Sequence, residues 1–373
     1  MGYRKFKGDQ IFTGKAFAPE NSVLITGETG AIEAIVPETE AGDDIRQVDG
    51  IISPGFINAH CHLELSHMKG LVPQATGMVD FLLQIMLQRN SNRDSIAEAI
   101  AAAENEMLAA GIVAVGDICN TADTLIQKQQ GRLYYHNFIE CSGFVPAAAS
   151  SRFESANQLL HQMENSSPGT IVPHAPYSVS PELFQLVESA AVGKTCTMHN
   201  QESAAENEFF LSGQGDFRKL FAAIGVSLDF FHPPHTTSLQ AVWPWLTTAQ
   251  KLILVHNVVT SQDDLSLVKE HPGLFFCLCP NANRYINNSL PPVELLLDNS
   301  CTIVLGTDSL ASNETLSILA EIKTLHQSFP ELPIATLFQW ATSNGAIALG
   351  IDQQYGTFEK NKRPGIIQVS DWT

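Results

Sequence analysis

Five apolar runs in this sequence end in polar side chains that can bind a metal ion. A single histidine at the end of a strand is usually a hydrogen-bonded capping group, but this recurrence is hard to explain by chance. Imidazole nitrogens and carboxylate oxygens are common ligands of Zn²⁺. The pattern therefore predicts a metal-dependent site where the runs end. The side chains concerned are His60, His62, His174, His199, His256 and Asp308.

The sharpest local element is the tripeptide His60-Cys61-His62. Alternation along a strand puts residues i and i+2 on the same face, so the two imidazoles can chelate one metal while Cys61 packs on the other side. His199 and Asp308 can complete a set of three imidazoles and one carboxylate. This set suits Zn²⁺, with Fe²⁺ and Mn²⁺ as alternatives.

Other residues nearby can supply acid–base chemistry. A metal lowers the pKa of a water bound to it to roughly 7, and the resulting hydroxide needs a proton shuttle. Glu202 follows His199 by three positions, where a loop can bring it over the metal, although a solvated acid at a helix start is the plainer alternative. His256 can hydrogen-bond the water and stabilise charge. Asp308 can act both as a ligand and as the acceptor of the water's proton.

The elements that must position these residues alternate along the middle of the chain. Helical patterns such as 95–111, 180–191 and 263–271 lie between short apolar runs typical of buried parallel strands. The runs cover residues 55–62, 111–118, 132–140, 169–176, 194–201, 251–258, 274–281 and 301–308. Strands that each precede a crossover predict an α/β fold, a (β/α)₈ TIM-like barrel, whose active site lies at the carboxyl ends of the strands. A doubly wound sheet is the alternative.

The two ends of the chain differ from this middle. Residues 1–53 carry β-branched residues broken by turn signals, and residues 355–373 return to that style after a helical segment near 334–350. This predicts a small β-sandwich domain built from both termini. The catalytic barrel then covers residues 54–354.

Composition limits the class of protein. A length of 373 residues fits one large barrel with a small satellite. Apolar residues make up 44%, which excludes general disorder, and a net charge of −18 without a basic run argues against nucleic-acid or anionic-membrane partners. No signal peptide and no membrane span are expected. The seven scattered cysteines are typical of free thiols in a reducing cytoplasm.

Several motifs together resemble the amidohydrolase superfamily. They are PGFINAHCH (54–62), His199 with Glu202, LVHN with His256 and GTDS with Asp308, and they follow the family's order. Within it the chain resembles the cytosine-deaminase-like branch that includes deaminases of adenosine derivatives. The segment 173–178 looks like the one that supplies a substrate-contacting histidine in S-adenosylhomocysteine and methylthioadenosine deaminases, which implies that role for His174.

The resemblance also implies the metal count. Dinuclear relatives carry a bridging lysine or glutamate at the end of strand four, whereas this chain offers His174 there. One divalent metal is therefore expected, most simply Zn²⁺. A small-molecule substrate and a homodimer are further implications.

The loop after the first metal pair bears on the substrate. HLELS (62–66) resembles a subset linked with 6-amino-6-deoxyfutalosine, which joins an adenine nucleoside to a benzoate in an alternative menaquinone pathway. Glu64 could accept hydrogen bonds from ribose hydroxyls. The benzoate would need a cation, for which Arg284 and Arg89 are candidates, although a surface arginine is an equal alternative for Arg284. The roles of three further histidines stay open: His67, His232 and His235.

The reaction implied is hydrolytic deamination at C6 of an adenine nucleoside, with Glu202 protonating the ring nitrogen and then the departing ammonia. His256 would hydrogen-bond the water, and Asp308 would accept its proton. Alternatives are deamination of S-adenosylhomocysteine, methylthioadenosine, adenosine or a free base, or hydrolysis of another C–N or C–Cl bond. A non-catalytic metal-holding barrel that serves as a binding protein is a further alternative, but it would not call for Glu202 and His256.

Overall fold

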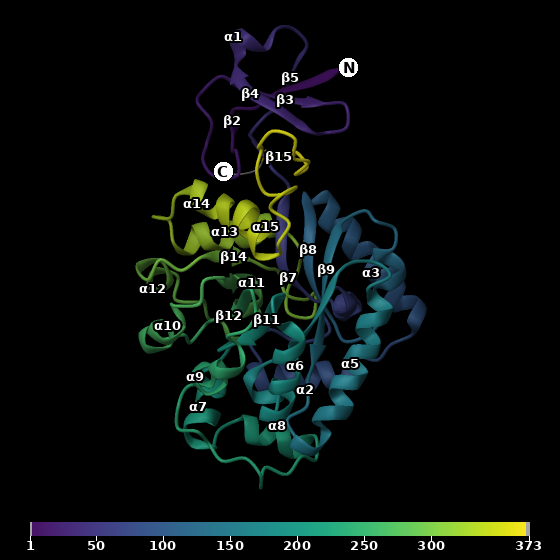
Figure 1. Cartoon of the computed structure of the whole chain (residues 1–373), viewed down its shortest axis with the longest axis vertical. Helices are drawn as coiled ribbons and strands as arrows, with labels where there is room; N and C mark the ends of the chain where they lie inside the picture. Colours follow the sequence, from purple (N-terminus) through teal and green to yellow (C-terminus); the bar gives the residue numbers. More distant parts are fainter. Residues whose placement is uncertain (1, 371–373) are drawn as a thin grey trace.

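The two ends of the chain meet in a small β-rich part at one end of the molecule (Figure 1). The computed structural model describes residues 2–370, so residues 371–373 of the predicted C-terminal segment lie outside the described residues. One small sheet has the order β4-β3-β1-β5 and the other the order β15-β6-β2. Their strands are β1(Tyr3–Lys7), β2(Gln10–Ile11), β3(Ser22–Gly27), β4(Ile32–Pro37), β5(Ile45–Gln47), β6(Ile51–Ser53) and β15(Ile367–Val369).

Contacts between the two ends hold this part together. β15 pairs antiparallel with β6, with Ile367 opposite Ser53. Leu24 and Ile52 from the beginning of the chain pack in one buried cluster with Phe358 from its end. The sandwich arrangement and the domain boundaries at 54 and 354 stay predictions.

Eight strands form two parallel sheets of four in the larger part of the molecule. Their orders are β10-β9-β8-β7 and β11-β12-β13-β14, and every pairing within them is parallel. Each predicted run coincides with one of these strands, although β8 and β9 extend one residue beyond the end of their runs. They are β7(Phe56–Cys61), β8(Ile112–Cys119), β9(Tyr134–Cys141), β10(Gly169–Pro173), β11(Thr195–Asn200), β12(Lys251–His256), β13(Leu274–Leu278) and β14(Ile303–Leu305).

The margins of the two sheets meet at both junctions. A parallel bridge pairs Cys61, the last residue of β7, with Asp308 just beyond β14. At the other junction the backbone N–H of His199 in β11 donates to the carbonyl of His174, which directly follows β10 (N···O 2.9 Å). The carboxyl ends of strands from both sheets therefore face one region.

Helices follow the strands, as the alternation predicts. Ser180 caps α6 by accepting from the Leu183 N–H, and Asn92 caps α3 in the same way from Asp94. The predicted segment near 334–350 is a run of helical turns made of α14, the π-helical η5 and α15. The longer helices are α2(Met78–Gln88), α3(Arg93–Ala109), α5(Ala149–Met163), α6(Pro181–Ala191), α7(Ala204–Ser212), α11(Pro280–Asn287) and α13(Ile318–Ser328). The shorter ones are α1(Glu38–Ala41), α4(Leu125–Lys128), α8(Phe217–Ala223), α9(Ser238–Val242), α10(Gln262–Val268), α12(Val293–Asp298), α14(Ile334–Gln339), η5(Trp340–Asn344), α15(Gly345–Ala348), η1(Leu63–Met68), η2(Pro146–Ala148), η3(Pro176–Ser178) and η4(Trp243–Trp245).

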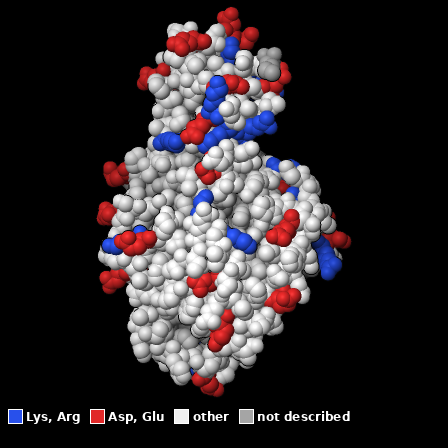
Figure 2. Space-filling model, viewed as in Figure 1, with Lys and Arg blue, Asp and Glu red and all other residues white. Residues whose placement is uncertain are grey.

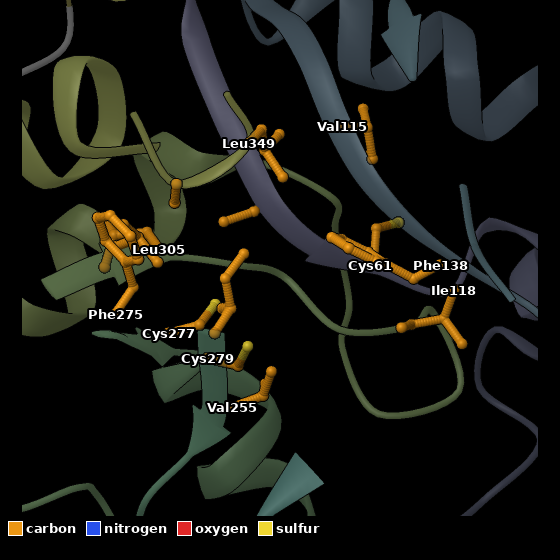
Figure 3. Packing of buried hydrophobic residues seen from close by; sticks show 14 of the residues in the cluster. Cys61, Val115, Ile118, Phe138, Val255, Phe275, Cys277, Cys279, Leu305 and Leu349 are labelled. Carbon is orange, nitrogen blue, oxygen red and sulfur yellow. The ribbon is translucent and has the colours of Figure 1, made fainter. Parts of the chain in front are cut away.

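The main core lies between the strands and the helices. Figure 3 shows Cys61, Cys277 and Cys279 packed among aliphatic side chains such as Leu305 and Val255. All seven cysteines are free thiols, as predicted, and all but Cys301 are buried. Cys277 and Cys279 are therefore core packing residues.

A second buried cluster covers the carboxyl ends of the strands. It unites α2, α7 and α8 through side chains such as Phe81, Phe209 and Phe221, and these helices lie together at the end of the molecule opposite the small sheets (Figure 1). Figure 2 shows acidic residues scattered over one face, with wide uncharged areas between them. None of the helices among residues 2–370 is long and apolar enough to cross a bilayer.

Candidate active site

Four of the predicted side chains converge at the carboxyl ends of β7, β11 and β14. One ligand atom each from His60, His62, His199 and Asp308 lies within 4.8 Å of the others, and all four residues are buried. The Nε2 atoms of His62 and His199 are 3.1 Å apart. Asp308 Oδ1 lies 3.6 Å from Nε2 of His60 and 3.4 Å from Nε2 of His62. These atoms surround one point.

The local backbone explains how the set forms. The pairing of β7 with β8 shifts register between Asn58 and Cys61, and such irregularities re-aim side chains beside active sites. A Cβ atom on Gly306 would lie 2.8 Å from the Cβ of His60, so only glycine allows this close approach. Asp308 adopts φ 57°, a left-handed conformation that costs energy in a residue with a side chain.

The chemistry of these donors fits a divalent metal. Neither ring nitrogen of His60 has a hydrogen-bond partner within the described residues, although both are buried. Burial lowers the pKa of His62 well below its ordinary value and that of His199 to about 4, so both rings are neutral and keep a lone pair. Nδ1 of His199 lies 2.9 Å from the His174 carbonyl, to which it must donate, and this tautomer leaves Nε2 for a metal.

Asp308 is ionised and held in place. Burial alone would raise its pKa, but the imidazoles around it, His60 and His62 among them, outweigh burial and hold the pKa below its usual range. Ser312 Oγ donates to Oδ2 at 2.6 Å. Asn58 and Thr307 exchange two hydrogen bonds, which fix the backbone immediately before Asp308. Sequence reasoning missed Ser312 and Asn58, since a lone serine or asparagine carries no signal of its own.

Glu202 and His256 lie beside this set. Glu202 Oε1 is 3.5 Å from Nε2 of His256, and both side chains are almost fully buried. Asn283 Nδ2 donates to His256 Nδ1 at 3.0 Å, which places the ring hydrogen on Nε2. Burial lowers the pKa of His256 well below its ordinary value. The ring is therefore a neutral hydrogen-bond donor, and its backbone is left-handed at φ 75°.

Glu202 is a buried acid and not the solvated residue of the alternative interpretation. Burial, with the negative charges of Asp308 and Glu206, raises its pKa well above the usual value and so favours the protonated carboxyl group. Glu206 accepts the backbone N–H groups of Gln201 and Glu202. Asn287 Nδ2 donates to the Glu202 carbonyl, so the chain on both sides of the acid is fixed.

A cavity of about 360 Å³ opens above these groups. His174 and Glu64 line it, and so do Glu202, His256 and Asp308. His174 Nδ1 lies 2.6 Å from Ser178 Oγ, which leaves Nε2 as the nitrogen available to a ligand. Sequence reasoning missed three polar lining residues, Asn120, Glu140 and Arg152.

Both carboxylate oxygens of Glu64 accept hydrogen bonds from the protein, whereas its predicted role is to accept hydrogen bonds from the substrate's ribose hydroxyls. Its Oε2 accepts from the backbone N–H groups of Asn120 and Thr121 at 2.9 Å each and from the Thr121 hydroxyl at 3.0 Å. Its Oε1 accepts from the Arg89 guanidinium at 3.2 Å. Burial raises its pKa to about 7 against the opposing effects of Arg89 and the two N–H groups. Glu64 thus anchors a loop and an arginine.

The predicted role of Arg284 is wrong. Arg284 lies in α11, which begins at Pro280 and turns Asn283 inward, so that Arg284 faces solvent. Its guanidinium donates to Ser328 Oγ, and it does not line the cavity. His67 caps the loop by contacting the carbonyls of Glu64 and Arg89.

The other histidines left open lie outside the cavity. His235 is exposed and contacts the Leu211 carbonyl, and His232 does not line the cavity. Asp117 accepts the Leu63 N–H at 2.8 Å and pairs with the fully buried Lys128 at 2.5 Å. Asp117 therefore anchors the backbone just after His62.

Glu321 gives a pH-dependent stability that can be measured. Its buried carboxyl accepts from the backbone and side chain of Asn281 and from Asn313, and burial raises its pKa to about 8. Between pH 4.5 and 8 the folded chain keeps a proton that the unfolded chain loses, so the free energy of unfolding falls as pH rises. One such group contributes at most about 1.4 kcal/mol per pH unit.

We therefore expect Glu321→Gln to flatten the fall in stability between pH 5.5 and 8, whatever its effect at a single pH. Urea unfolding at several pH values measures the slope. Glu331→Gln, at an exposed site, is the control and should keep the wild-type slope. Identical slopes in all three proteins would contradict the prediction.

Comparison with known proteins places this geometry in a family. The amidohydrolase family profile matches residues 51–372. The chain is 23% identical to the 5-methylthioadenosine/S-adenosylhomocysteine deaminase of Desulforudis audaxviator, over 95% of this chain and 80% of that protein.

Solved structures agree in fold. Helicobacter pylori aminofutalosine deaminase in complex with methylthio-coformycin matches with a TM-score of 0.81 at 21% identity, over 97% of this chain and 91% of that one. An adenosine deaminase from Xanthomonas campestris with bound zinc matches with a TM-score of 0.77 at 22% identity, over 98% and 84%. With the parallel strands and intervening helices, this likeness implies a TIM-barrel fold. The chain belongs to the amidohydrolase family.

Proposed function

We propose that this chain is a metal-dependent hydrolytic deaminase of an adenine-nucleoside derivative. The observation that carries the proposal is the convergence of Glu202, His256 and Asp308 on the wall of one cavity, where burial raises the pKa of Glu202 and lowers that of His256. An acid, a neutral donor and a base around one point are what the addition of water to an amidine carbon requires. The deaminase names of the relatives support the same chemistry.

His60, His62, His199 and Asp308 would hold the metal, for which the nitrogen-rich donor set favours Zn²⁺. When bound, the metal supplies a nucleophile at neutral pH by lowering the pKa of its water ligand. The protein contributes four rigid donors.

The remaining steps belong to side chains. Asp308 accepts the proton that the attacking water loses, and His256 donates from Nε2 to the oxygen that adds to C6. Glu202 gives its proton to the adjacent ring nitrogen, which allows the C6 centre to become tetrahedral. The ionised Glu202 then takes the proton of the added hydroxyl group and delivers it to the amino group, so that the C6–N bond breaks to leave a 6-oxo product and ammonia. The proton held by Asp308 returns to Glu202 and restores the starting state. Water is consumed and ammonia is released.

The first test is ammonia release by metal-replete protein. The panel holds aminodeoxyfutalosine, S-adenosylhomocysteine, methylthioadenosine, adenosine, cytosine and guanine, with a chlorinated triazine and an amide as representatives of other hydrolyses. We expect kcat/KM of about 10⁴ M⁻¹s⁻¹ or more on one adenosine derivative. Activity on a free base, triazine or amide alone would contradict the nucleoside assignment, and bound metal without any turnover would favour a binding protein.

Within this class we propose 6-amino-6-deoxyfutalosine, in the menaquinone pathway, as the substrate. Its benzoate tail needs an apolar wall and a cation. Phe81, Phe144 and Phe221 line the cavity, as does Arg152, whose guanidinium has no acidic partner among residues 2–370. Arg89 also lines the cavity, but Glu64 pairs with it. Arg152 therefore replaces Arg284 as the cation proposed for the carboxylate.

Arg152→Met tests this assignment. We expect kcat/KM for aminodeoxyfutalosine to fall about tenfold to a hundredfold relative to that for methylthioadenosine, because only the former carries the carboxylate. Arg284→Met is the matched control and should leave the ratio of the two values unchanged, since its guanidinium bonds Ser328 outside the cavity. An equal loss on both substrates in Arg152→Met would show that Arg152 does not distinguish the tail.

The proposed setting is the cytoplasm, which the seven free thiols support. The homodimer implied by the resemblance stays a prediction.

A further inference from the structure

Four carboxylates line the cavity, and three of them already have a proposed chemical role or are fully hydrogen-bonded to the protein. Glu202 and Asp308 take part in the proposed proton transfers. Glu64 accepts three hydrogen bonds on Oε2 and one from Arg89 on Oε1. Glu140, which lies near the end of β9, has no role in the chemistry described above.

Glu140 is buried with one oxygen unsatisfied. Its side chain is only 7% exposed. Oε2 accepts from Asn120 Nδ2 at 2.9 Å, whereas Oε1 has no hydrogen-bond partner within the described residues. Nδ1 of His199 lies 3.4 Å from Oε1, but its hydrogen points to the His174 carbonyl at 2.9 Å. A buried carboxylate oxygen without a donor is costly, so a ligand that supplies one is favoured here.

The neighbours of Oε1 argue against a second cation as that ligand. The group Glu140, His174 and His199 has metal-like spacing. However, Nδ1 of His199 is occupied by its donated hydrogen, and Nδ1 of His174 faces Ser178 Oγ. Only Oε1 of Glu140 and Nε2 of His174 then remain as ligand atoms, which are too few for a metal site, whereas one neutral hydrogen-bond donor would satisfy Oε1.

We propose that Glu140 is a specificity-determining residue that accepts a hydrogen bond from a sugar hydroxyl of the nucleoside. The inference rests on the proposed function, since that function supplies a sugar next to the reacting base. Asn120 holds Oε2, which leaves Oε1, on a residue that lines the cavity, without a donor among the described residues. This assigns to Glu140 the part that the sequence analysis gave to Glu64, whose oxygens are already engaged.

Calorimetric binding of adenosine, 2′-deoxyadenosine and 3′-deoxyadenosine tests the proposal. The metal-replete Glu202→Gln protein serves as background, because it should bind these ligands without turning them over. With Glu140 present, we expect at least one deoxynucleoside to bind about tenfold to a hundredfold more weakly than adenosine, the usual range for a hydrogen bond to a charged group. With Glu140→Met added, we expect the difference to shrink to about threefold or less.

Two further variants separate this role from a structural one. Glu64→Gln in the same background should keep the preference for the hydroxyl, whatever happens to affinity overall. Glu140→Gln keeps the shape of the side chain, and Asn120 then holds its oxygen so that the amide NH₂ faces the ligand. It should also weaken the preference, so the test stands if Glu140→Met fails to fold.

The outcomes are distinct. An undiminished preference in both Glu140 variants, or an equal loss of all three ligands, would overturn the proposal, because Glu140 would then act only through His199. Failure to bind adenosine at all would overturn it as well. A preference that depends on Glu140, in a protein that deaminates no member of the ammonia-release panel, would support it and instead overturn the proposed function.

Discussion

Replacement of Glu202 by Gln is expected to lower kcat by about 10²- to 10⁴-fold, the range for loss of a general acid–base group. The carboxamide keeps the shape of the side chain but has no proton to give to a ring nitrogen. Burial and the nearby charges of Asp308 and Glu206 raise the pKa of the wild-type carboxyl group and favour its protonated form, so the substitution removes a proton that the reaction uses. Initial rates of ammonia release at saturating substrate measure the effect.

The metal content of Glu202→Gln distinguishes loss of the general acid from damage to the metal site. Glu202 is not among the four converging ligand residues, and Glu206 and Asn287 hold its backbone, so Glu202→Gln should bind as much metal as wild type. Glu208→Gln, on the exposed side of α7, is the matched control and should retain full activity. Retained activity in Glu202→Gln would remove Glu202 from the proposed role.

The sequence predicts the strands and the converging residues for a clear physical reason. Apolar runs of strand length that end in histidine or aspartate differ clearly from the segments on either side of them. Side chains alternate along a strand with a period of two, which places His60 and His62 on the same face. Parallel strands then bring His199 and Asp308 to the same edge, although more than a hundred residues separate them. The convergence follows from topology alone.

The lining of the cavity could not be predicted in the same way. Arg284 lies one residue after Asn283, and a helix separates neighbours by about 100°, so one faces inward and the other outward. Glu140 ends a predicted strand, and that signal was available. Arg152 lies in α5, and only long-range packing decides that this helix brings it to the cavity.

Removal of the metal by a chelator is expected to abolish turnover, because the side chains then have acids and bases but no activated water. The thermal midpoint should also fall, since a ligand that binds only the folded state stabilises it by mass action. Nε2 of His62 and Nε2 of His199 lie only 3.1 Å apart, so one ion can bind both rings. Elemental analysis, activity and thermal unfolding before and after chelation measure these effects.

Titration of the chelated protein with Zn²⁺ is expected to restore activity at one ion per chain. In the second group with metal-like spacing, Glu140, His174 and His199, Nδ1 of His199 donates to the His174 carbonyl. At most two ligand atoms therefore remain, and this group should not add to the stoichiometry. His62→Asn should lose both the ion and activity, whereas Glu202→Gln should lose activity alone, and this contrast separates ligands from the acid. Recovery that requires two ions per chain would contradict the mononuclear site and would make Glu140 a ligand.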